Sequence, residues 1–361
     1  MVEWKKLGEI SNLVRGKVLS KDFIRDHEGE YPVYSSQTAN NGVLGYIDSY
    51  MFDGDFLTWT TDGAYAGTIF RRNGKFNITN VCGLIKLEDF RINQDFLFYW
   101  LSVSAKDYVL EGMGNPKLMS NVASTIKIPI PSLEEQHRIV GILDTFTDSI
   151  ENLKQQIAQR RKQYEHYRDQ LLDLEGKEGV EMKTLGEIGE ICMCKRIMKN
   201  QTAESGEVPF FKIGTFGSLP DAFISKTLFE EYKSKYSYPK KGDILISAAG
   251  TIGKSVIFDG KDAYFQDSNI VWIDNDETKV SNAFLRYFYQ VAKWKTDGGT
   301  IKRLYNYNLK NTSISIPPLS EQQRIVSILD TFEASISNLE AQLAQRQKQY
   351  EYYRNQLLTF E

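Results

Sequence analysis

Cysteine is scarce in this sequence, and the scarcity argues against two kinds of cross-linked scaffold. The 361 residues contain three cysteines, an odd and sparse number that speaks against a disulfide framework. Cys192 and Cys194 stand close together, but a structural zinc site needs four ligands at recognisable spacings, and the sequence has only three histidines. We therefore expect no metal site and interpret the cysteines as buried or incidental thiols.

Long hydrophobic runs are absent as well. No stretch of about eighteen apolar residues occurs, so we expect no membrane-spanning segment and no membrane partner. The opening residues, MVEWKKLGEI, lack the apolar core and cleavage site of a secretory signal, and we expect a cytoplasmic protein. The composition, 41% hydrophobic and 25% charged, is that of an ordinary globular protein, and the length predicts two domains or one large one.

The common catalytic motifs are missing too. The sequence has no G-x-G-x-x-G, G-x-S-x-G or H-E-x-x-H. The segment AAGTIGKS at residues 248–255 resembles a phosphate-binding loop, but it begins with alanine and is followed by a predicted strand, whereas such a loop opens a helix. Asn115-Pro116-Lys117 is not the Asn-Pro-Pro-aromatic motif of an adenine methyltransferase. We expect this chain to catalyse nothing and to bind no cofactor itself.

The sequence repeats itself. Residues 128–175 match residues 314–361 at two thirds of their positions, so that IPIPSLEEQHRIVGILDTF returns as ISIPPLSEQQRIVSILDTF. A shorter match relates residues 2–10 to residues 180–188. The chain is therefore two tandem halves, divided near residue 175, whose middles have diverged. A duplicated scaffold with dissimilar middles indicates two recognition units of one kind, directed at different targets.

Each repeated segment predicts one long helix. Apolar or aromatic residues recur with alternating spacings of four and three, interrupted by one arginine at the same place in both segments. The positions are Ile139, Leu143, Phe146, Ile150, Leu153, Ile157, Arg160, Tyr164, Tyr167, Leu171 and Leu174, and Ile325, Leu329, Phe332, Ile336, Leu339, Leu343, Arg346, Tyr350, Tyr353, Leu357 and Phe360. A sustained period of about 3.5 residues is typical of a coiled-coil seam.

The residues before each helical run predict where it starts. Ser132 with Glu135, and Ser320 with Gln323, offer the spacing of a capping box. If the two seams pair antiparallel, the helices form a rod of fixed length between the two divergent middles. Such a rod would act as a ruler.

The divergent middles predict mixed α/β units. Short runs of β-branched and aromatic residues alternate with Gly, Asn and Asp. The predicted strands lie within residues 54–61, 67–70, 76–81, 81–87, 242–247, 255–258 and 269–273, and short helices are expected at residues 93–108 and 281–295. The predicted fold class is α+β, with two globular mixed α/β domains joined by two long antiparallel coiled-coil helices in a pseudo-two-fold tandem repeat.

Charge is divided unevenly along the chain. The net charge of −3 and the pI near 5.9 count against a protein whose whole surface binds nucleic acid. The acidic excess lies largely in the two helical segments, which carry ten basic and fifteen acidic residues. Basic clusters occur at residues 71–75 and 293–303, the second running through Gly298, Gly299 and Thr300. Such clusters can neutralise phosphates, although a solvated loop is an equally good interpretation of either one alone.

The segment that opens each long helix is distinctive. It reads IPSLEEQHRIV at residues 130–140 and IPPLSEQQRIV at residues 316–326, each time after a divergent unit, and WKKLGEI at 4–10 returns as KTLGEI at 183–188. With these motifs, the chain resembles over its whole length the specificity subunit of a type I restriction-modification system.

The resemblance implies a division of labour among four segments. Residues 1–131 and 176–318 would be target recognition domains, each reading one part of a bipartite, asymmetric DNA site. Residues 132–175 and 319–361 would be the central and C-terminal conserved helices, which set the spacer and dock two modification subunits. Those partners would use S-adenosylmethionine to methylate adenine, and restriction/translocase subunits would use ATP and Mg²⁺.

Candidate DNA contacts follow from the chemistry of base readout and from place in the family pattern. Arg and Lys suit guanine, and Asn and Gln suit adenine. The candidates for DNA contact in the first unit are Ser36, Gln37, Thr38, Asn40, Asn41, Thr61, Asp62 and Tyr65, and in the second Lys212, Thr215, Lys254, Ser255, Lys302 and Arg303. Arg71, Arg72 and Lys117 are expected to hold phosphates.

Two other classes of function compete with DNA recognition. A non-catalytic adaptor would use the coiled coil and two protein-binding modules without DNA. An NTP-using enzyme would depend on Lys254. Neither explains why the scaffold is copied while the middles diverge.

Overall fold

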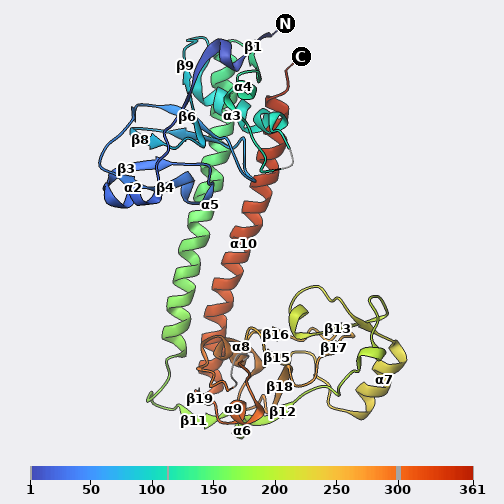
Figure 1. The fold of residues 1–361 in the computed structure, drawn as a ribbon. Coiled ribbons are helices and arrows are strands. Elements are labelled where there is room, and N and C mark those ends of the chain that lie inside the picture. The colour runs from blue at the N-terminus through green and yellow to red at the C-terminus, as the bar shows by residue number, and fades with distance from the viewer. Residues whose placement is uncertain (1, 112–113, 298–301, 361) are drawn as a thin grey trace. The chain divides into compact units, whose positions relative to one another are not determined.

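The computed structural model describes residues 2–111, 114–297 and 302–360, so Gly298, Gly299 and Thr300 of the second basic cluster lie outside the described residues. The chain forms two compact units, coloured by residue number in Figure 1. Unit 1 comprises Met1–Lys154 and Gln342–Glu361, and unit 2 comprises Gln155–Ala341. Both divisions fall inside long helices, because each helix end packs on the unit beside it. The four-segment boundaries implied by the sequence stay a prediction.

Unit 1 is built on three small sheets. Their strand orders are β1-β10, β2-β9-β6-β7 and β4-β3-β8-β5, all antiparallel except for the parallel pair β3 and β8. The strands are β1 (Glu3–Lys6), β2 (Ser11–Arg15), β3 (Glu28–Tyr34), β4 (Val43–Ile47), β5 (Phe52–Asp53), β6 (Phe56–Thr60), β7 (Ile69–Arg72), β8 (Lys75–Ile78), β9 (Cys82–Leu87) and β10 (Lys127–Ile130). Strand β6 is buried along almost its whole length because it is an inner strand that helix α3 contacts.

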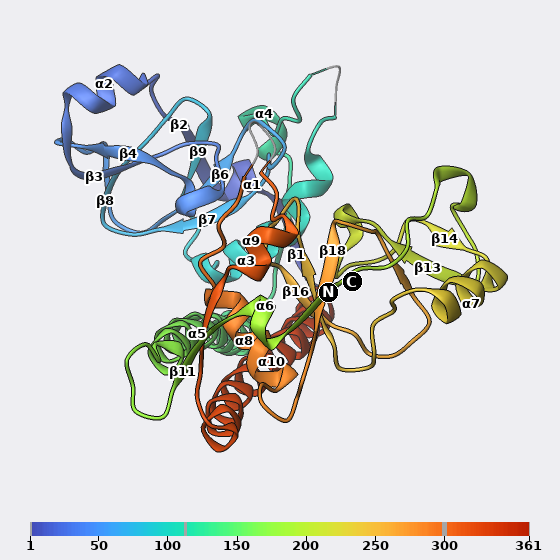
Figure 2. The ribbon, with the colours of Figure 1, turned by 90° about the horizontal axis from the view of Figure 1, so that it is seen from below.

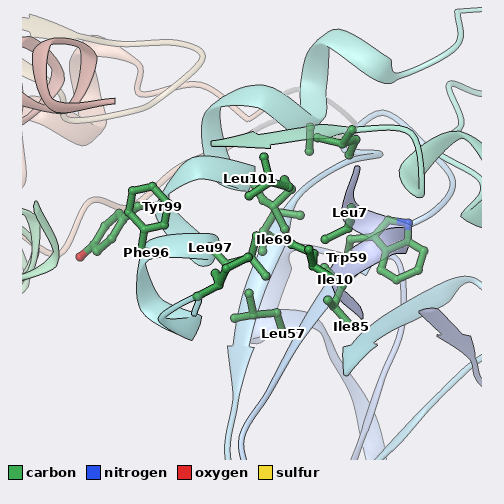
Figure 3. Close-up of a cluster of buried hydrophobic side chains, with 14 of the residues drawn as sticks. Leu7, Ile10, Leu57, Trp59, Ile69, Ile85, Phe96, Leu97, Tyr99 and Leu101 are labelled. Carbon is green, nitrogen blue, oxygen red and sulfur yellow. The ribbon is translucent and has the colours of Figure 1, made fainter. Parts of the chain in front are cut away.

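Short helices cover the sheets of unit 1. They are α1 (Leu7–Ile10), α2 (Lys21–Asp26), α3 (Gln94–Ser104), α4 (Ser120–Ala123) and the 3-10 turns η1 (Ala39–Gly42) and η2 (Ala105–Tyr108). Helix α3 begins where Asn93 Oδ1 accepts hydrogen bonds from the next turn. Figure 3 shows its Phe96 and Leu97 in one cluster with Leu57 and Trp59, so the sheet and α3 share one hydrophobic core.

Unit 2 repeats this plan. Its sheets have the orders β11-β19, β12-β18-β15-β16 and β14-β13-β17, with β13 and β17 parallel. The strands are β11 (Glu181–Thr184), β12 (Gly189–Cys192), β13 (Val208–Phe211), β14 (Phe223–Ile224), β15 (Ile244–Ser247), β16 (Ser255–Ile257), β17 (Tyr264–Phe265), β18 (Ile270–Asn275) and β19 (Ser313–Ile316). Each sheet of unit 2 thus has its counterpart in unit 1, although the sequences between the repeated segments differ.

The helices of unit 2 are partly conserved in position and partly new. They are α6 (Leu185–Ile188), α7 (Lys226–Lys235), α8 (Asn282–Val291), α9 (Asn306–Lys310) and the 3-10 turns η3 (Lys199–Gln201) and η4 (Ile213–Thr215). Helix α7, which has no counterpart at the same place among the described residues of unit 1, lies beside β13 and β14 in Figure 2 and packs its Phe229 into their core. Each of the seven predicted strand runs overlaps a strand, and the predicted mixed α/β architecture is confirmed.

The second predicted short helix is shorter than expected. Helix α8 ends at Val291, and the chain turns so that Trp294 packs against Tyr289, with ring centroids 5.8 Å apart. The indole also fills the space above Gly253, where a Cβ would stand 2.2 Å from its nitrogen. Gly253, in the segment that resembles a phosphate loop, therefore serves a close packing contact, and a strand follows, as predicted.

The two long helices are α5 (Leu133–Leu172) and α10 (Leu319–Leu357), and within each unit their segments pack antiparallel. In unit 2, Arg161 of α5 bonds Glu340 of α10, and Tyr167 of α5 stacks on Phe332 of α10 with ring centroids 5.4 Å apart. Residue numbers in α10 therefore decrease along the contact as those in α5 increase, so the helices run antiparallel. The predicted antiparallel pairing of the two helices is confirmed within each unit.

The one arginine in each helical seam packs over an aromatic ring of the other long helix. Arg160 lies over the Phe332 ring at 5.8 Å, and Arg346 lies over the Phe146 ring at 5.6 Å. A guanidinium can occupy an otherwise apolar seam here because it faces an aromatic ring rather than an aliphatic side chain.

The first predicted helix start is confirmed and the second is wrong. Ser132 Oγ accepts from Glu135 N at 3.2 Å, and α5 begins at Leu133. In the second copy Pro318 stands where Ser132 stands in the first, and α10 already begins at Leu319. Ser320 is therefore inside the helix and does not cap it with Gln323.

A buried glutamine in the first turn of each long helix ties it to the preceding unit. Gln136 Nε2 donates to Arg91 O and Pro131 O, both at 2.9 Å, and Oε1 accepts from Asn93 N at 2.7 Å. Gln322 makes the same three bonds to Lys279 O, Pro317 O and Ser281 N. The glutamine of the repeated motif thus joins each long helix to the preceding unit.

Candidate nucleic-acid interface

Three loops of unit 1 meet at one surface, which we call site 1 and define by Arg15, Thr61, Asp62, Asn80 and Lys117. Arg15 at the end of β2 donates from Nε to Asn80 O at 3.0 Å, in the β8–β9 turn. Its Nη2 donates to Thr61 Oγ1 at 3.2 Å, in the β6–β7 loop. The sheet order brings these loops together, because β2, β9 and β6 are neighbouring strands.

The segment around Lys117 completes site 1. Lys117 forms backbone bridges with Asp62 and Leu110, and Lys117 Nζ lies 3.8 Å from Asp62 Oδ1. Thr61 Oγ1 donates to the other oxygen of that carboxylate at 2.6 Å. Site 1 therefore joins the predicted residues Thr61, Asp62 and Lys117, while Tyr65 is an exposed side chain on the same loop.

The candidates from Ser36 to Asn41 lie apart from these contacts, on the connection between β3 and β4. Asn40, Asn41 and Gly42 all have positive φ values, of 49°, 50° and 79°. Asparagine tolerates this left-handed region better than most residues. The turn therefore carries the two exposed asparagine side chains outward, while Ser36, Gln37 and Thr38 are half-buried.

Arg72, predicted to hold a phosphate, lies beneath this turn. It is 3% exposed, donates to Thr58 Oγ1 and Asn41 O, and lies over the Tyr34 ring at 3.6 Å. Burial lowers the pKa of its guanidinium. Arg71 is exposed but bonds Asp95 and Asp144 at 2.8 and 3.2 Å. Both arginines thus have roles in the fold, and their contact with phosphate stays a prediction.

Unit 2 presents a pocket of about 550 Å³, which we call site 2 and define by Arg196, Lys199, Lys212, Asp267 and Arg303. Arg196 Nε donates to Asp267 Oδ2 at 2.9 Å. Arg303 Nη2 donates to Asn269 Oδ1 at 2.6 Å, and Lys212 Nζ lies 2.9 Å from Asp221 Oδ1. Four cations around one concave surface are suited to an anionic or strongly hydrogen-bonding ligand.

The remaining candidates of unit 2 are distributed around site 2. Thr215 Oγ1 accepts from Lys212 N at 3.2 Å, so it fixes the turn η4. Lys254 Nζ donates to Phe216 O, and Ser255 begins β16. Lys302 is exposed beside Arg303. Among these four, none lines the pocket itself.

Sites 1 and 2 occupy equivalent places in the two units. Leu118 N donates to Thr61 O at 2.9 Å, and Leu304 N donates to Ala248 O at 2.8 Å. The residue before each leucine is a cation, Lys117 or Arg303. The same backbone frame therefore holds a cation at one position in both units while the surrounding side chains differ.

The residues that sequence reasoning missed are Arg15 and Asn80 in site 1 and Arg196, Lys199 and Asp267 in site 2. Arg15 and Arg196 each follow a copy of the repeated Leu-Gly-Glu-Ile motif within a few residues. A search for cations at the start of each divergent segment would have found them. Asp267 had no such signal, since its partner is far away in the sequence.

Metal and membrane features can be stated for the described ranges 2–111, 114–297 and 302–360. No three His, Cys, Asp or Glu side chains gather there in a way that could hold a metal ion. No helix in those ranges is both long and apolar enough to cross a bilayer. Burial raises the pKa of the Cys82 thiol to about 11 and that of Cys194 to about 12, so these thiols stay protonated and unreactive at neutral pH.

Comparison with known proteins gives consistent matches over both units. The family described as type I restriction modification DNA specificity domain matches residues 1–160 and 177–347. A protein of Haemophilus influenzae named as a type I restriction enzyme specificity subunit is 46% identical over 99% of this chain and 96% of its own length. A Mycoplasma pneumoniae protein named as a type I specificity subunit is 31% identical, over 98% of this chain and 96% of its own.

Two solved structures share the fold. The S subunit of a type I restriction-modification system from M. genitalium has a TM-score of 0.64 at 16% identity, covering 100% of this chain and 97% of that one. A chain from a study of complex assembly in the type I restriction-modification system has a TM-score of 0.61 at 18% identity, covering 99% and 96%.

Proposed function

The chain belongs to the family of type I restriction modification DNA specificity domains, and we propose that it is the DNA sequence-specificity subunit of a type I restriction-modification complex. In this role it recognises DNA and leaves the chemistry to its partners. Its relatives are named as specificity subunits. The match covers both halves of the chain, so both units take part.

The observation that carries this proposal is the pair of equivalent sites. The same backbone arrangement occurs in both units. In site 1 it presents amide, hydroxyl and carboxylate groups together with two cations. In site 2 it presents four cations and a carboxylate. Different donors and acceptors on one frame read different base sequences. We propose that each unit reads one part of a bipartite, asymmetric DNA site.

The long helices supply the rest of the proposed role. Their antiparallel pairing within each unit supports an assignment as the element that sets the unspecified spacer and docks two modification subunits. Restriction/translocase subunits would join these. S-adenosylmethionine would then belong to the modification subunits, and ATP with Mg²⁺ to the restriction subunits, with no cofactor on this chain. Since the substrate is chromosomal DNA, the proposed place of work is the cytoplasm.

The test is to express the chain with its modification subunit and map the methylated adenines in the host genome. We expect one bipartite motif with unlike halves. Exchanging residues 11–127 for those of a relative should change one half of the motif and leave the other intact. A change in both halves, or methylation without a defined motif, would contradict the proposal.

An adaptor without DNA is the alternative, and salt separates the two. Binding through phosphates weakens steeply as salt rises, because each neutralised phosphate releases counterions. We expect the affinity of the complex for duplex DNA to fall by orders of magnitude between about 50 and 200 mM salt. An adaptor would show no affinity for duplexes at either concentration.

A further inference from the structure

One ion pair in site 2 has the geometry of a base-reading device. The Arg196 side chain is 66% exposed, whereas its partner Asp267 is 15% exposed, so the carboxylate lies beneath the guanidinium. Among the described residues, Asp267 is the one hydrogen-bonding partner of Arg196, through Nε. The two terminal amino groups of Arg196 therefore remain as a pair of parallel donors directed away from the carboxylate.

The position of Asp267 is fixed by a strained turn. Ser268, the next residue, has a φ of 58°, which is uncommon for a residue with a side chain. Its hydroxyl donates to Asp267 Oδ2 at 3.3 Å, and Asn269 N donates to Asp267 O at 2.7 Å. On the other side Gln266 joins the end of β13, where its Oε1 accepts from Ile213 N at 2.9 Å. Strain held in place by several bonds is typical of sites that position a functional group.

From this geometry we propose that Arg196 and Asp267 read one G·C base pair in the half-site of unit 2. Arg196 would donate from its terminal amino groups to guanine O6 and N7, and the free oxygen of Asp267 would accept from the cytosine amino group. The inference rests on the proposed function and adds the identity of one base pair to it.

The chemistry favours G·C over the other pairs. An adenine presents an amino donor beside N7, which would face the donors of Arg196, whereas guanine presents two acceptors. A lysine offers no such planar fork, so the cations Lys199 and Lys212 on the same pocket suit phosphates instead. In site 1 the guanidinium of Arg15 bonds Asn80 and Thr61, so its fork is directed at the protein.

The test is competition binding by the complex of this chain with its modification subunit. The probes are duplexes that carry the recognised motif and every single base-pair change in it. We expect Arg196→Ala to lower discrimination at one G·C pair by roughly 10- to 100-fold. Arg196→Lys keeps the charge but loses the fork, so it should lose the same discrimination while keeping more of the total affinity. Asp267→Asn should weaken the preference at that same pair.

Lys199→Ala is the matched control. It removes a cation from the same pocket, and it should weaken binding to all duplexes by one factor and lower the slope of log affinity against log salt by about 1. Unchanged preference at the other base pairs of the unit 2 half-site reports that unit 2 is folded in each variant. If Arg196→Ala keeps every base preference, or weakens all duplexes equally, the inference is wrong and the proposed function stands. A wild-type complex without sequence preference would overturn both.

Discussion

The side chains that connect the repeated motif to the fold are the two buried glutamines Gln136 and Gln322. Each satisfies two backbone carbonyls and one amide that would otherwise be left without partners at a helix start. A buried polar group without a partner costs about 1–3 kcal/mol. The motif is therefore explained by a helix joint rather than by contact with DNA.

This explanation predicts that Gln136→Ala lowers the free energy of unfolding by about 2–4 kcal/mol, because it leaves three backbone groups unpaired. Gln322→Ala should have an effect of similar size in unit 2. Urea denaturation measures both. Gln170→Ala, at an exposed position of α5, should change the free energy by less than about 0.5 kcal/mol. Equal effects of the buried and exposed substitutions would contradict the assignment.

A second prediction at this scale concerns pH. Hydrogen bonds from Arg91 lower the pKa of the Asp89 carboxyl to about 2, from an ordinary value of 3.8. A carboxyl whose pKa is lower in the folded protein than in the unfolded chain stabilises the fold at pH values above the unfolded pKa. This contribution is lost as the pH falls toward 2. The unfolding free energy of Asp89→Asn should therefore lie below that of the wild type at pH 6, and the gap should narrow below about pH 4. Urea titrations at pH 6, 4 and 3 measure the gap; a gap independent of pH would contradict the prediction.

At the scale of elements, the sequence predicted what depends on local period and turn chemistry. The heptad spacing located both long helices, and runs of β-branched residues located strands such as β6 and β18. Which strands lie side by side was not accessible, because the parallel pair of β3 and β8 joins segments far apart in the chain. For the same reason Lys117 and Arg303 were predicted as DNA contacts, whereas Asp267, whose partner Arg196 is 71 residues away in the sequence, was not.

The mistaken helix start has a physical cause as well. The prediction required a hydroxyl before each run, and Ser320 was the nearest in the second copy. The structure instead begins α10 directly after Pro318, whose fixed φ suits the entry to a helix and which has no N–H to satisfy. The burial of Arg72 was likewise not predicted, since a run of basic residues does not reveal which side chains point inward.

The seam arginines give a prediction for the helix pair. Arg346→Ala removes the guanidinium from the Phe146 ring and the packing of its stem, and we expect a loss of about 1 kcal/mol in unfolding free energy. Arg160→Ala should cost a similar amount through Phe332. As a control, Arg161→Ala breaks an exposed ion pair with Glu340 and should cost less than about 0.5 kcal/mol. Chemical denaturation measures the three; a larger loss for Arg161 would contradict the role of the ring contacts.

At the scale of the whole molecule, each unit takes part of its core from the other half of the sequence. Leu358 is buried in the core of unit 1, with Leu357 and Phe360 packed against that core. Leu174 is buried in the core of unit 2, with Leu171 and Leu172 beside it. The duplicated segments are therefore exchanged, and neither half of the sequence contains all of its own unit.

This exchange predicts a remote effect. Leu358→Ala should lower the stability of unit 1 by about 2–4 kcal/mol, because a buried leucine is truncated in its core. Hydrogen exchange should show faster opening in β6 and β9, with the strands of unit 2 unchanged. Leu319→Ala, at an exposed position of the same helix, is the control. Loss of protection in unit 2 instead would contradict the exchange.

The exchanged helix ends also set an order of events during synthesis. Domains generally fold from the N-terminus as the ribosome delivers them, but unit 1 lacks residues 342–361 until all of unit 2 has been translated. Unit 2 is one continuous stretch, so all of it has left the ribosome before the newborn chain can complete the unit that was translated first. A stop codon that removes residues 342–361 would therefore damage the unit that contains residues 1–154.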